Sequence, residues 1–209
     1  MEYFPFFLDI EGQKGLIVGG GTVALRKVEK LLPFSPRLTV AAPEICPELE
    51  VISGLELLRR PFSPELLEGA RFVIAATDSP VLNQQVAQLC RQRGILVNVV
   101  DDQENCTFLF PALVKRGGLC VGVSTGGSSP SAAAWLRGRV EDLLPESFEQ
   151  ILDYLYQVRP LVKERLPEES RAAAFSALFA ACMEAGRPLD EGEFQNILAE
   201  FLDGPEEMP

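Results

Sequence analysis

The feature that most constrains the fold is a short β-type run at residues 15–18 that leads directly into three glycines and a helical pattern. In the spacing G-x-G-x-x-A, Gly19 permits a tight turn, Gly21 lets the backbone approach a ligand, and small Ala24 lets helix and strand pack closely. Free N–H groups at a helix start favour a diphosphate. The segment predicts a dinucleotide site, with a glycine turn of purely structural value as the alternative. The residues expected to contact the dinucleotide are Gly19, Gly20, Gly21, Thr22, Val23 and Ala24.

The helix predicted after this turn has two distinct faces. Spacing of three and four residues places one set of side chains on an apolar face, namely Ala24, Val28, Leu31 and Leu32. The opposite face carries Arg26, Lys27, Glu29 and Lys30. Pro33 is expected to end the helix.

The first half of the chain alternates short apolar runs with helical patterns. Strands are expected at residues 15–18, 38–41, 56–59, 72–75 and 95–100, and a second helix at residues 81–93. This alternation is typical of βαβ units and a parallel sheet. The predicted fold class is therefore α/β, with a Rossmann-type parallel sheet domain.

The pattern changes after Asp101. Residues 112–115 and 119–124 indicate two antiparallel strands around a tight Gly117-Gly118 turn. A helix is expected from Pro130, which suits its first position, to about residue 144, and Ser129 can cap it.

The remainder of the chain is expected to be helical. Asp190 followed three residues later by Glu193 predicts an approximate capping box for the last helix. Residues 203–209 are expected to form a frayed tail.

Ligands of an open parallel sheet lie beyond the carboxyl ends of its strands. Cofactor contacts are therefore expected at Ala41, Thr77, Asp78 and Asn98. The acidic residue that usually grips the ribose hydroxyls at this position of the fold is missing beside Ala41, and Glu44 comes slightly late. Because no Arg or Lys stands nearby to receive a 2′-phosphate, the sequence favours NAD over NADP.

Asp101 is the candidate catalytic residue. It follows two valines of an apolar strand, where partial desolvation would raise its pKa toward use as a general base. Histidine is absent from the chain, so proton transfer has to use other groups. The alternative is a surface carboxylate or helix cap in a loop.

A second glycine-rich entry to a helix can receive another anion. The candidate substrate contacts there are Thr125, Gly126, Gly127 and Ser128, with Arg137 on the following helix as a cationic anchor. Taken alone, such a segment is more often a turn and a cap, and an arginine on such a helix is often only part of a solvated face.

The composition excludes several classes of function. A net charge of −11 and a pI near 4.6 oppose binding to nucleic acid. No apolar run approaches membrane-spanning length, and the Met1 start lacks the features of a signal peptide. Five widely spaced cysteines without a CxxC pair fit the reducing cytoplasm, and no cluster has the spacing of metal ligands.

Four segments in this order and spacing resemble the siroheme-synthase dehydrogenase family: LIVGGGTVALRKVEKLL, AATDSPVLNQQV, NVVDDQENCTFLFPA and VGVSTGGSSPSAAAWLR. The resemblance covers about residues 3–145. It implies a homodimer with a Rossmann domain at residues 1–111, a dimerisation region at residues 112–145 and a helical domain at residues 146–209.

The resemblance also implies a reaction, namely hydride transfer from precorrin-2 to NAD to give sirohydrochlorin. Some members are in addition ferrochelatases that insert ferrous iron into sirohydrochlorin. The family's acid/base aspartate in the NVVD motif corresponds to Asp101. The family commonly has serine where this chain has Thr125, which keeps the hydroxyl. A macrocycle supplies its own nitrogen ligands, so chelation needs no ligand cluster from the protein.

Two rival hypotheses remain open at this stage. One is a non-catalytic NAD(H)-sensing Rossmann module whose helical tail contacts a protein partner. The other is a dehydrogenase for a different small acid, anchored by Arg137.

Overall fold

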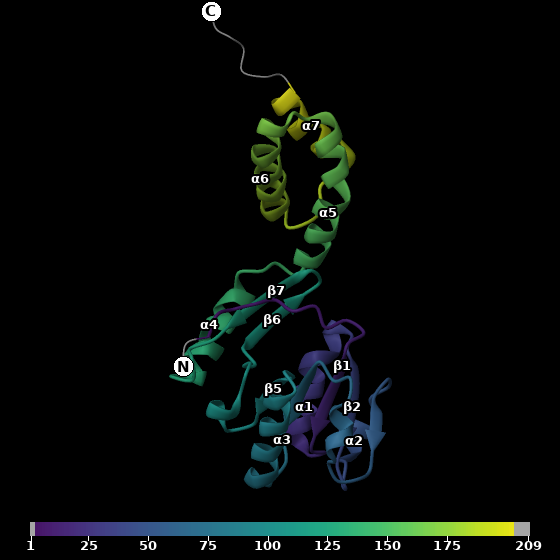
Figure 1. Cartoon of the computed structure of the whole chain (residues 1–209). Coiled ribbons are helices and arrows are strands. Elements are labelled where there is room, and N and C mark those ends of the chain that lie inside the picture. Colours follow the sequence, from purple (N-terminus) through teal and green to yellow (C-terminus); the bar gives the residue numbers. More distant parts are fainter. Residues whose placement is uncertain (1–2, 203–209) are drawn as a thin grey trace, which may run out of the picture. The chain divides into compact units, whose positions relative to one another are not determined.

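The computed structural model describes residues 3–202 and divides the chain into two compact units, Met1–Phe110 and Pro111–Pro209 (Figure 1). The tail expected at residues 203–209 lies outside the described residues. The further division expected at residue 145, inside the second unit, stays a prediction.

The first unit is built on a parallel sheet, which within residues 3–202 has five strands in the order β3-β2-β1-β4-β5. Its strands are β1 (Lys14–Val18), β2 (Arg37–Ala41), β3 (Glu56–Leu58), β4 (Phe72–Ala75) and β5 (Leu96–Val99). Its helices are α1 (Thr22–Leu31), α2 (Pro47–Glu50) and α3 (Pro80–Gln92), with 3₁₀ turns η1 (Leu32–Phe34), η2 (Pro64–Leu67) and η3 (Gln103–Asn105). The order reverses direction beside β1, so the predicted Rossmann-type α/β fold is confirmed.

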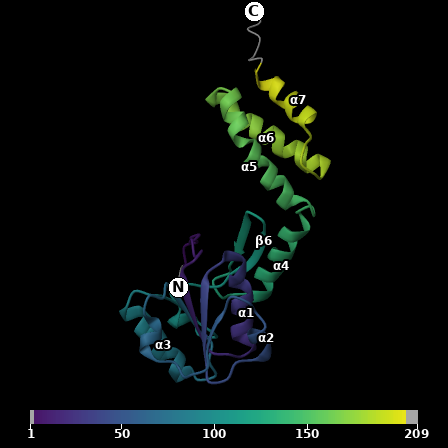
Figure 2. The ribbon, with the colours of Figure 1, turned by 90° about the vertical axis from the view of Figure 1, so that its right-hand side faces the viewer.

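Helices cover both faces of this sheet, with α3 on one side and α1 and α2 on the other (Figure 2). Alternate residues of β1 feed the two cores: Leu16 packs on the side of α3, and Ile17 packs with Val28 of α1. All three side chains are buried. Burying a side chain of this size stabilises the fold by about 1.5–3 kcal/mol. Because the strands are buried on both faces of the sheet, their sequences are continuous apolar runs.

The second unit begins with an antiparallel hairpin of β6 (Ala112–Arg116) and β7 (Leu119–Val123), joined at Gly117, whose φ of +48° suits the tight turn. Its helices are α4 (Pro130–Asp142), α5 (Phe148–Arg165), α6 (Glu168–Ala185) and α7 (Glu191–Leu202). The helix α4 packs against the hairpin. The last three helices share an apolar core, in which Ile151, Leu178 and Leu198 are fully or almost fully buried.

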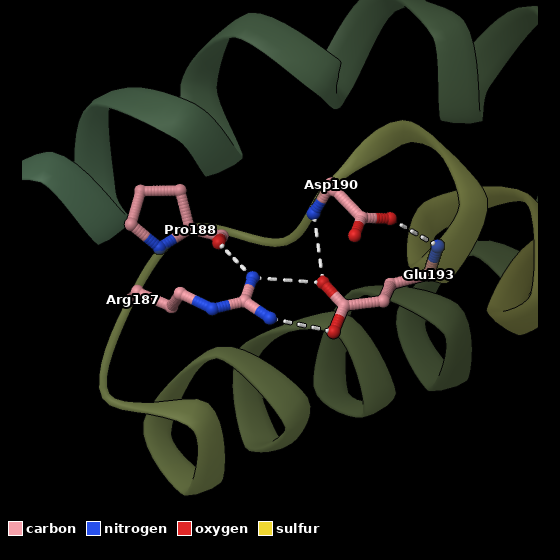
Figure 3. Close-up of polar contacts among 4 residues, drawn as sticks. All are labelled: Arg187, Pro188, Asp190 and Glu193. Atoms are coloured by element: carbon pink, nitrogen blue, oxygen red, sulfur yellow. Dashed lines mark hydrogen bonds and ion pairs between the residues drawn. The ribbon is translucent and has the colours of Figure 1, made fainter.

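The expected start of the last helix is confirmed (Figure 3). The Glu193 N–H donates to Asp190 Oδ1 at 2.9 Å, and the Asp190 N–H donates to Glu193 Oε2 at 2.8 Å. Arg187 adds an ion pair to Glu193 at 2.8 Å and donates to the Pro188 carbonyl oxygen. The reciprocal bonds satisfy two backbone donors that the helix itself leaves without partners.

Replacing Asp190 with alanine removes one half of this capping box. We expect Asp190→Ala to destabilise the start of α7 by about 1 kcal/mol, which lowers amide protection there about fivefold. Hydrogen exchange of the α7 amides measures the loss. The matched control is Asn196→Ala, an exposed position within α7, and equal protection in the two variants would contradict the prediction.

Acid should loosen the same helix start. The hydrogen bonds from Arg187 and from the Asp190 backbone hold the pKa of Glu193 below its usual range. A lowered carboxyl pKa gives stability that is complete above the unfolded pKa and is lost as the pH falls through the folded one. We expect α7 protection to decline in acid in the native chain, whereas Glu193→Gln should show a flatter decline.

Candidate functional site

The first two glycines of the turn are required by close packing of backbone on backbone. Gly19 has a φ of +125°, and its N–H donates to Ala41 O at 3.0 Å. A Cβ on Gly19 would lie 2.2 Å from Ala76 O, and one on Gly20 would lie 2.1 Å from Glu44 O. These contacts bring the turn after β1 against the segments that follow β2 and β4. The role of Gly20 in this packing is not predicted by the sequence pattern, which assigns it only to the cofactor.

Gly21 differs, because a Cβ there would meet nothing within 4 Å. It is exposed and precedes α1, and among the described residues no side chain caps that helix. The following Thr22 and Val23 are exposed, while Ala24 is fully buried against the sheet. The N–H groups of the first turn of α1 are therefore open to an anion, and contact of this turn with a pyrophosphate stays a prediction.

The carboxyl ends of the strands lie level at one edge of the sheet. Val18 stands opposite Ala41 on one side and Ala75 on the other, and Ala75 stands opposite Val99. The glycine turn, Ala41, Thr77, Asp78 and Asp101 accordingly gather at this edge. A dinucleotide on the turn would extend along it.

Thr77 is held by a residue that the sequence analysis missed. Asn83 is buried on α3, where its Oδ1 accepts a hydrogen bond from the Thr77 hydroxyl at 2.7 Å and its Nδ2 donates to Thr77 O at 2.9 Å. The Ser79 N–H donates to the same hydroxyl at 3.2 Å, and Ser79 caps α3. Asp78 remains exposed. The sequence does carry a signal for this role, because Asn83 lies three residues before Val86 and therefore on the apolar face of the helix.

Asn98 is buried and bonded within the protein. Its Oδ1 accepts from Lys27 Nζ at 3.3 Å, and its Nδ2 donates to Phe108 O at 3.1 Å. Lys27 was expected opposite the apolar face of α1, but it is half-buried, with its ammonium 4.0 Å from the centre of the Phe110 ring. Contact between the Asn98 side chain and the cofactor stays a prediction.

Asp101 lies where the chain reverses after β5. Residues 106–108 return alongside the strand: the Thr107 N–H donates to Val97 O at 2.8 Å, and Cys106 Sγ accepts from the Val99 N–H at 3.1 Å. Asp101 adopts a left-handed backbone with a φ of +58°, which aspartate tolerates better than most residues. Its side chain is exposed, so the desolvation expected from the flanking valines is absent.

The second glycine-rich segment belongs to the other unit. Ser129 caps α4 by accepting from the Ala132 N–H at 3.1 Å, and the Thr125 hydroxyl donates to Ser129 O at 3.0 Å, so the expected cap is confirmed. Gly126 and Gly127 have φ values of +61° and +89°.

The other candidate substrate contacts of this unit are Ser128 and Arg137. Ser128 is exposed. Arg137 is paired with Glu141, with its Nη1 at 2.8 Å from both carboxylate oxygens. Like those of Thr125, Gly126 and Gly127, their contacts with a substrate stay predictions.

Within residues 3–202, no three Asp, Glu, Cys or His side chains gather closely enough to hold a metal ion. In the same range, no helix is both long enough and apolar enough to cross a membrane. The five cysteines are unbridged.

The fold and the open glycine turn define the chain as a Rossmann-type dinucleotide-binding protein. Residues 6–112 match the model of the family described as "Putative NAD(P)-binding", and the chain belongs to that family. Its cofactor is therefore a nicotinamide dinucleotide.

Similar proteins carry the name siroheme synthase. That of Zymomonas mobilis is 40% identical over 211 residues, which cover 97% of this chain and 44% of the relative. That of Chromobacterium violaceum is 43% identical over 171 residues, which cover 80% of this chain and 36% of the relative. The chain thus spans less than half the length of these relatives.

A solved structure has the same fold over almost the whole chain. It is named "SirC, precorrin-2 dehydrogenase" and superposes with a TM-score of 0.72 at 24% identity, covering 95% of this chain and 98% of the other.

The glycine turn generates a prediction that separates binding from folding. We expect Gly21→Ala to fold within about 1 kcal/mol of the native chain but to bind NAD at least about tenfold more weakly, because the methyl group occupies the open approach to the helix start. Calorimetric titration and thermal unfolding measure the two effects.

The matched control is Gly118→Ala, where a Cβ also meets nothing within 4 Å but the position lies in the hairpin. Undiminished NAD affinity in Gly21→Ala would show that the pyrophosphate does not lie over this residue.

Proposed function

We propose that the chain catalyses the NAD-dependent dehydrogenation of precorrin-2 to sirohydrochlorin. The observation that carries the proposal is the place of Asp101, held at the strand edge that also presents the open glycine turn. The names of the relatives and of the structure with the same fold support the substrate. NAD is favoured over NADP, because no basic residue follows β2 closely.

The reaction removes a hydride and a proton from the substrate. When bound, the dinucleotide supplies the hydride acceptor. The Asp101 carboxylate accepts the proton, since it is exposed and the chain contains no histidine. The left-handed backbone of Asp101 fixes the direction in which its side chain projects from the edge of the sheet. Such conformations often occur at functional sites.

Precorrin-2 is a polycarboxylate, and the second unit offers donors for it. We assign its carboxylates to the segment Thr125, Gly126, Gly127 and Ser128, and to Arg137, which would exchange its partner Glu141 for the substrate. Ferrous iron is proposed as a further substrate, with Asp101 as the proton acceptor during insertion into sirohydrochlorin.

We also propose a homodimer in the cytoplasm. The dimerisation region at residues 112–145 contains large apolar side chains that water would otherwise cover: Trp135 is 65% exposed and Leu143 is 75% exposed. Exposed apolar residues close together on one region of a chain favour contact with another protein surface. The unbridged cysteines support a reducing compartment.

The test is anaerobic incubation of the chain with precorrin-2 and NAD, followed by the absorbance of sirohydrochlorin, with and without ferrous ion. We expect Asp101→Asn to lower kcat by at least about 100-fold while NAD still binds, because the amide cannot accept the proton.

The control is Glu104→Gln, an exposed carboxylate in the same loop. Normal turnover in Asp101→Asn would refute the assigned base. Binding of NAD without turnover by the native chain would instead favour the NAD(H)-sensing module.

A further inference from the structure

We propose that Lys27 is a positioning residue that ties the dinucleotide helix α1 to the segment holding Asp101. The expected effect of Lys27 on turnover rests on the function proposed above. The link between the two segments concerns only residues of the first unit and can be tested without turnover.

Two contacts of Lys27 support this link. The ammonium donates to Asn98 Oδ1 at 3.3 Å, and it lies 4.0 Å from the centre of the Phe110 ring. Asn98 belongs to β5 and Phe110 to the segment that returns from Asp101, so the lysine contacts the chain on both sides of the reversal. One side chain thereby joins the helix that begins at the glycine turn to both sides of the candidate base.

Asn98 connects Lys27 to the segment that returns from Asp101. Its Nδ2 donates to Phe108 O at 3.1 Å, while its Oδ1 faces Lys27. The amide is buried, so both of its ends need partners within the protein. Loss of the lysine would leave Oδ1 without this donor and would loosen the contact that aligns β5 with residues 106–110.

The charge of Lys27 gives the link a pH dependence. Burial, and after it the charge of Lys30 on the same helix, lower the pKa of Lys27 to about 8, while Cys106 and Asp101 act in the opposite direction. The ammonium is attracted to the Phe110 ring, but a pKa below that of an exposed lysine means that the ordered segment holds the neutral amine more readily than a loosened segment does. The order of the segment should therefore increase as the pH rises through this pKa, because the cost of the buried charge is then removed.

The experiment compares Lys27→Met, Lys27→Arg and the control Lys30→Met in the full chain. Amide hydrogen exchange of Val97, Val99 and Thr107 is measured as protection factors, at neutral pH and at about pH 9. We expect Lys27→Met to lower protection about tenfold at neutral pH, because both contacts are lost. The native chain should gain protection at the higher pH, whereas Lys27→Arg, whose guanidinium keeps its charge, should not.

Turnover supplies the second readout. We expect Lys27→Met to lower kcat about tenfold with the KM for NAD changed by less than about twofold, because the glycine turn is untouched while Asp101 is misplaced. Lys27→Arg should recover kcat. Lys30→Met should match the native chain at neutral pH and move the alkaline gain in protection to higher pH, since a neighbouring positive charge is removed.

The outcomes distinguish the two proposals. If the native chain does not oxidise precorrin-2, the proposed function fails, and protection factors alone decide the role of Lys27. Unchanged protection and an unchanged pH profile in Lys27→Met would overturn the link. Should Lys27→Met fail to fold, the native chain and Lys27→Arg still decide it, because the same change of protection in both between neutral pH and about pH 9 would contradict the proposal.

Discussion

Backbone packed against backbone at the end of β1 is the constraint on which the candidate site depends. Gly19 and Gly20 have no room for a side chain, because carbonyl oxygens of Ala76 and Glu44 lie where a Cβ would be. This contact draws the ends of neighbouring strands together and directs α1 away from the edge with its first N–H groups uncovered. The open position of Gly21 follows from that packing, and so do the uncovered N–H groups that we propose as the binding site of a diphosphate.

A second constraint acts at the other end of the same edge. The chain leaves β5, reverses at Asp101 and returns alongside the strand, with Cys106 and Thr107 bonded to its backbone. These bonds hold an aspartate in a left-handed conformation, which has a cost of about 1–3 kcal/mol that the surrounding bonds offset. The dinucleotide turn and the candidate base are thus fixed independently by local packing, and Lys27 joins the two.

Elements governed by local periodicity could be predicted from the sequence. The alternation of strands and helices, the glycine turn, the Ser129 cap and the Asp190–Glu193 capping box all depend on residues close together in the chain. The spacing of Arg137 and Glu141 also allows the ion pair that the structure shows, although from the sequence alone Arg137 is considered only as an anchor for a substrate or as part of a solvated face.

Contacts between distant segments could not be predicted in this way. Lys27 meets Asn98 across 71 positions, and its half-buried place contradicts the helical face assigned to it from spacing alone. The expected desolvation of Asp101 was wrong for a related reason. Neighbouring valines bury the strand, but the reversal that follows carries the carboxylate out to solvent.

We place a nicotinamide dinucleotide along the carboxyl edge of the sheet, from the glycine turn to Asp101. Titration of the isotope-labelled chain with NAD, followed by backbone amide chemical shifts, tests this placement. We expect the amides of Gly20, Gly21 and Thr22 to shift together with that of Asp101. Shifts confined to the opposite edge of the sheet, around Glu68 and Arg93, would contradict it.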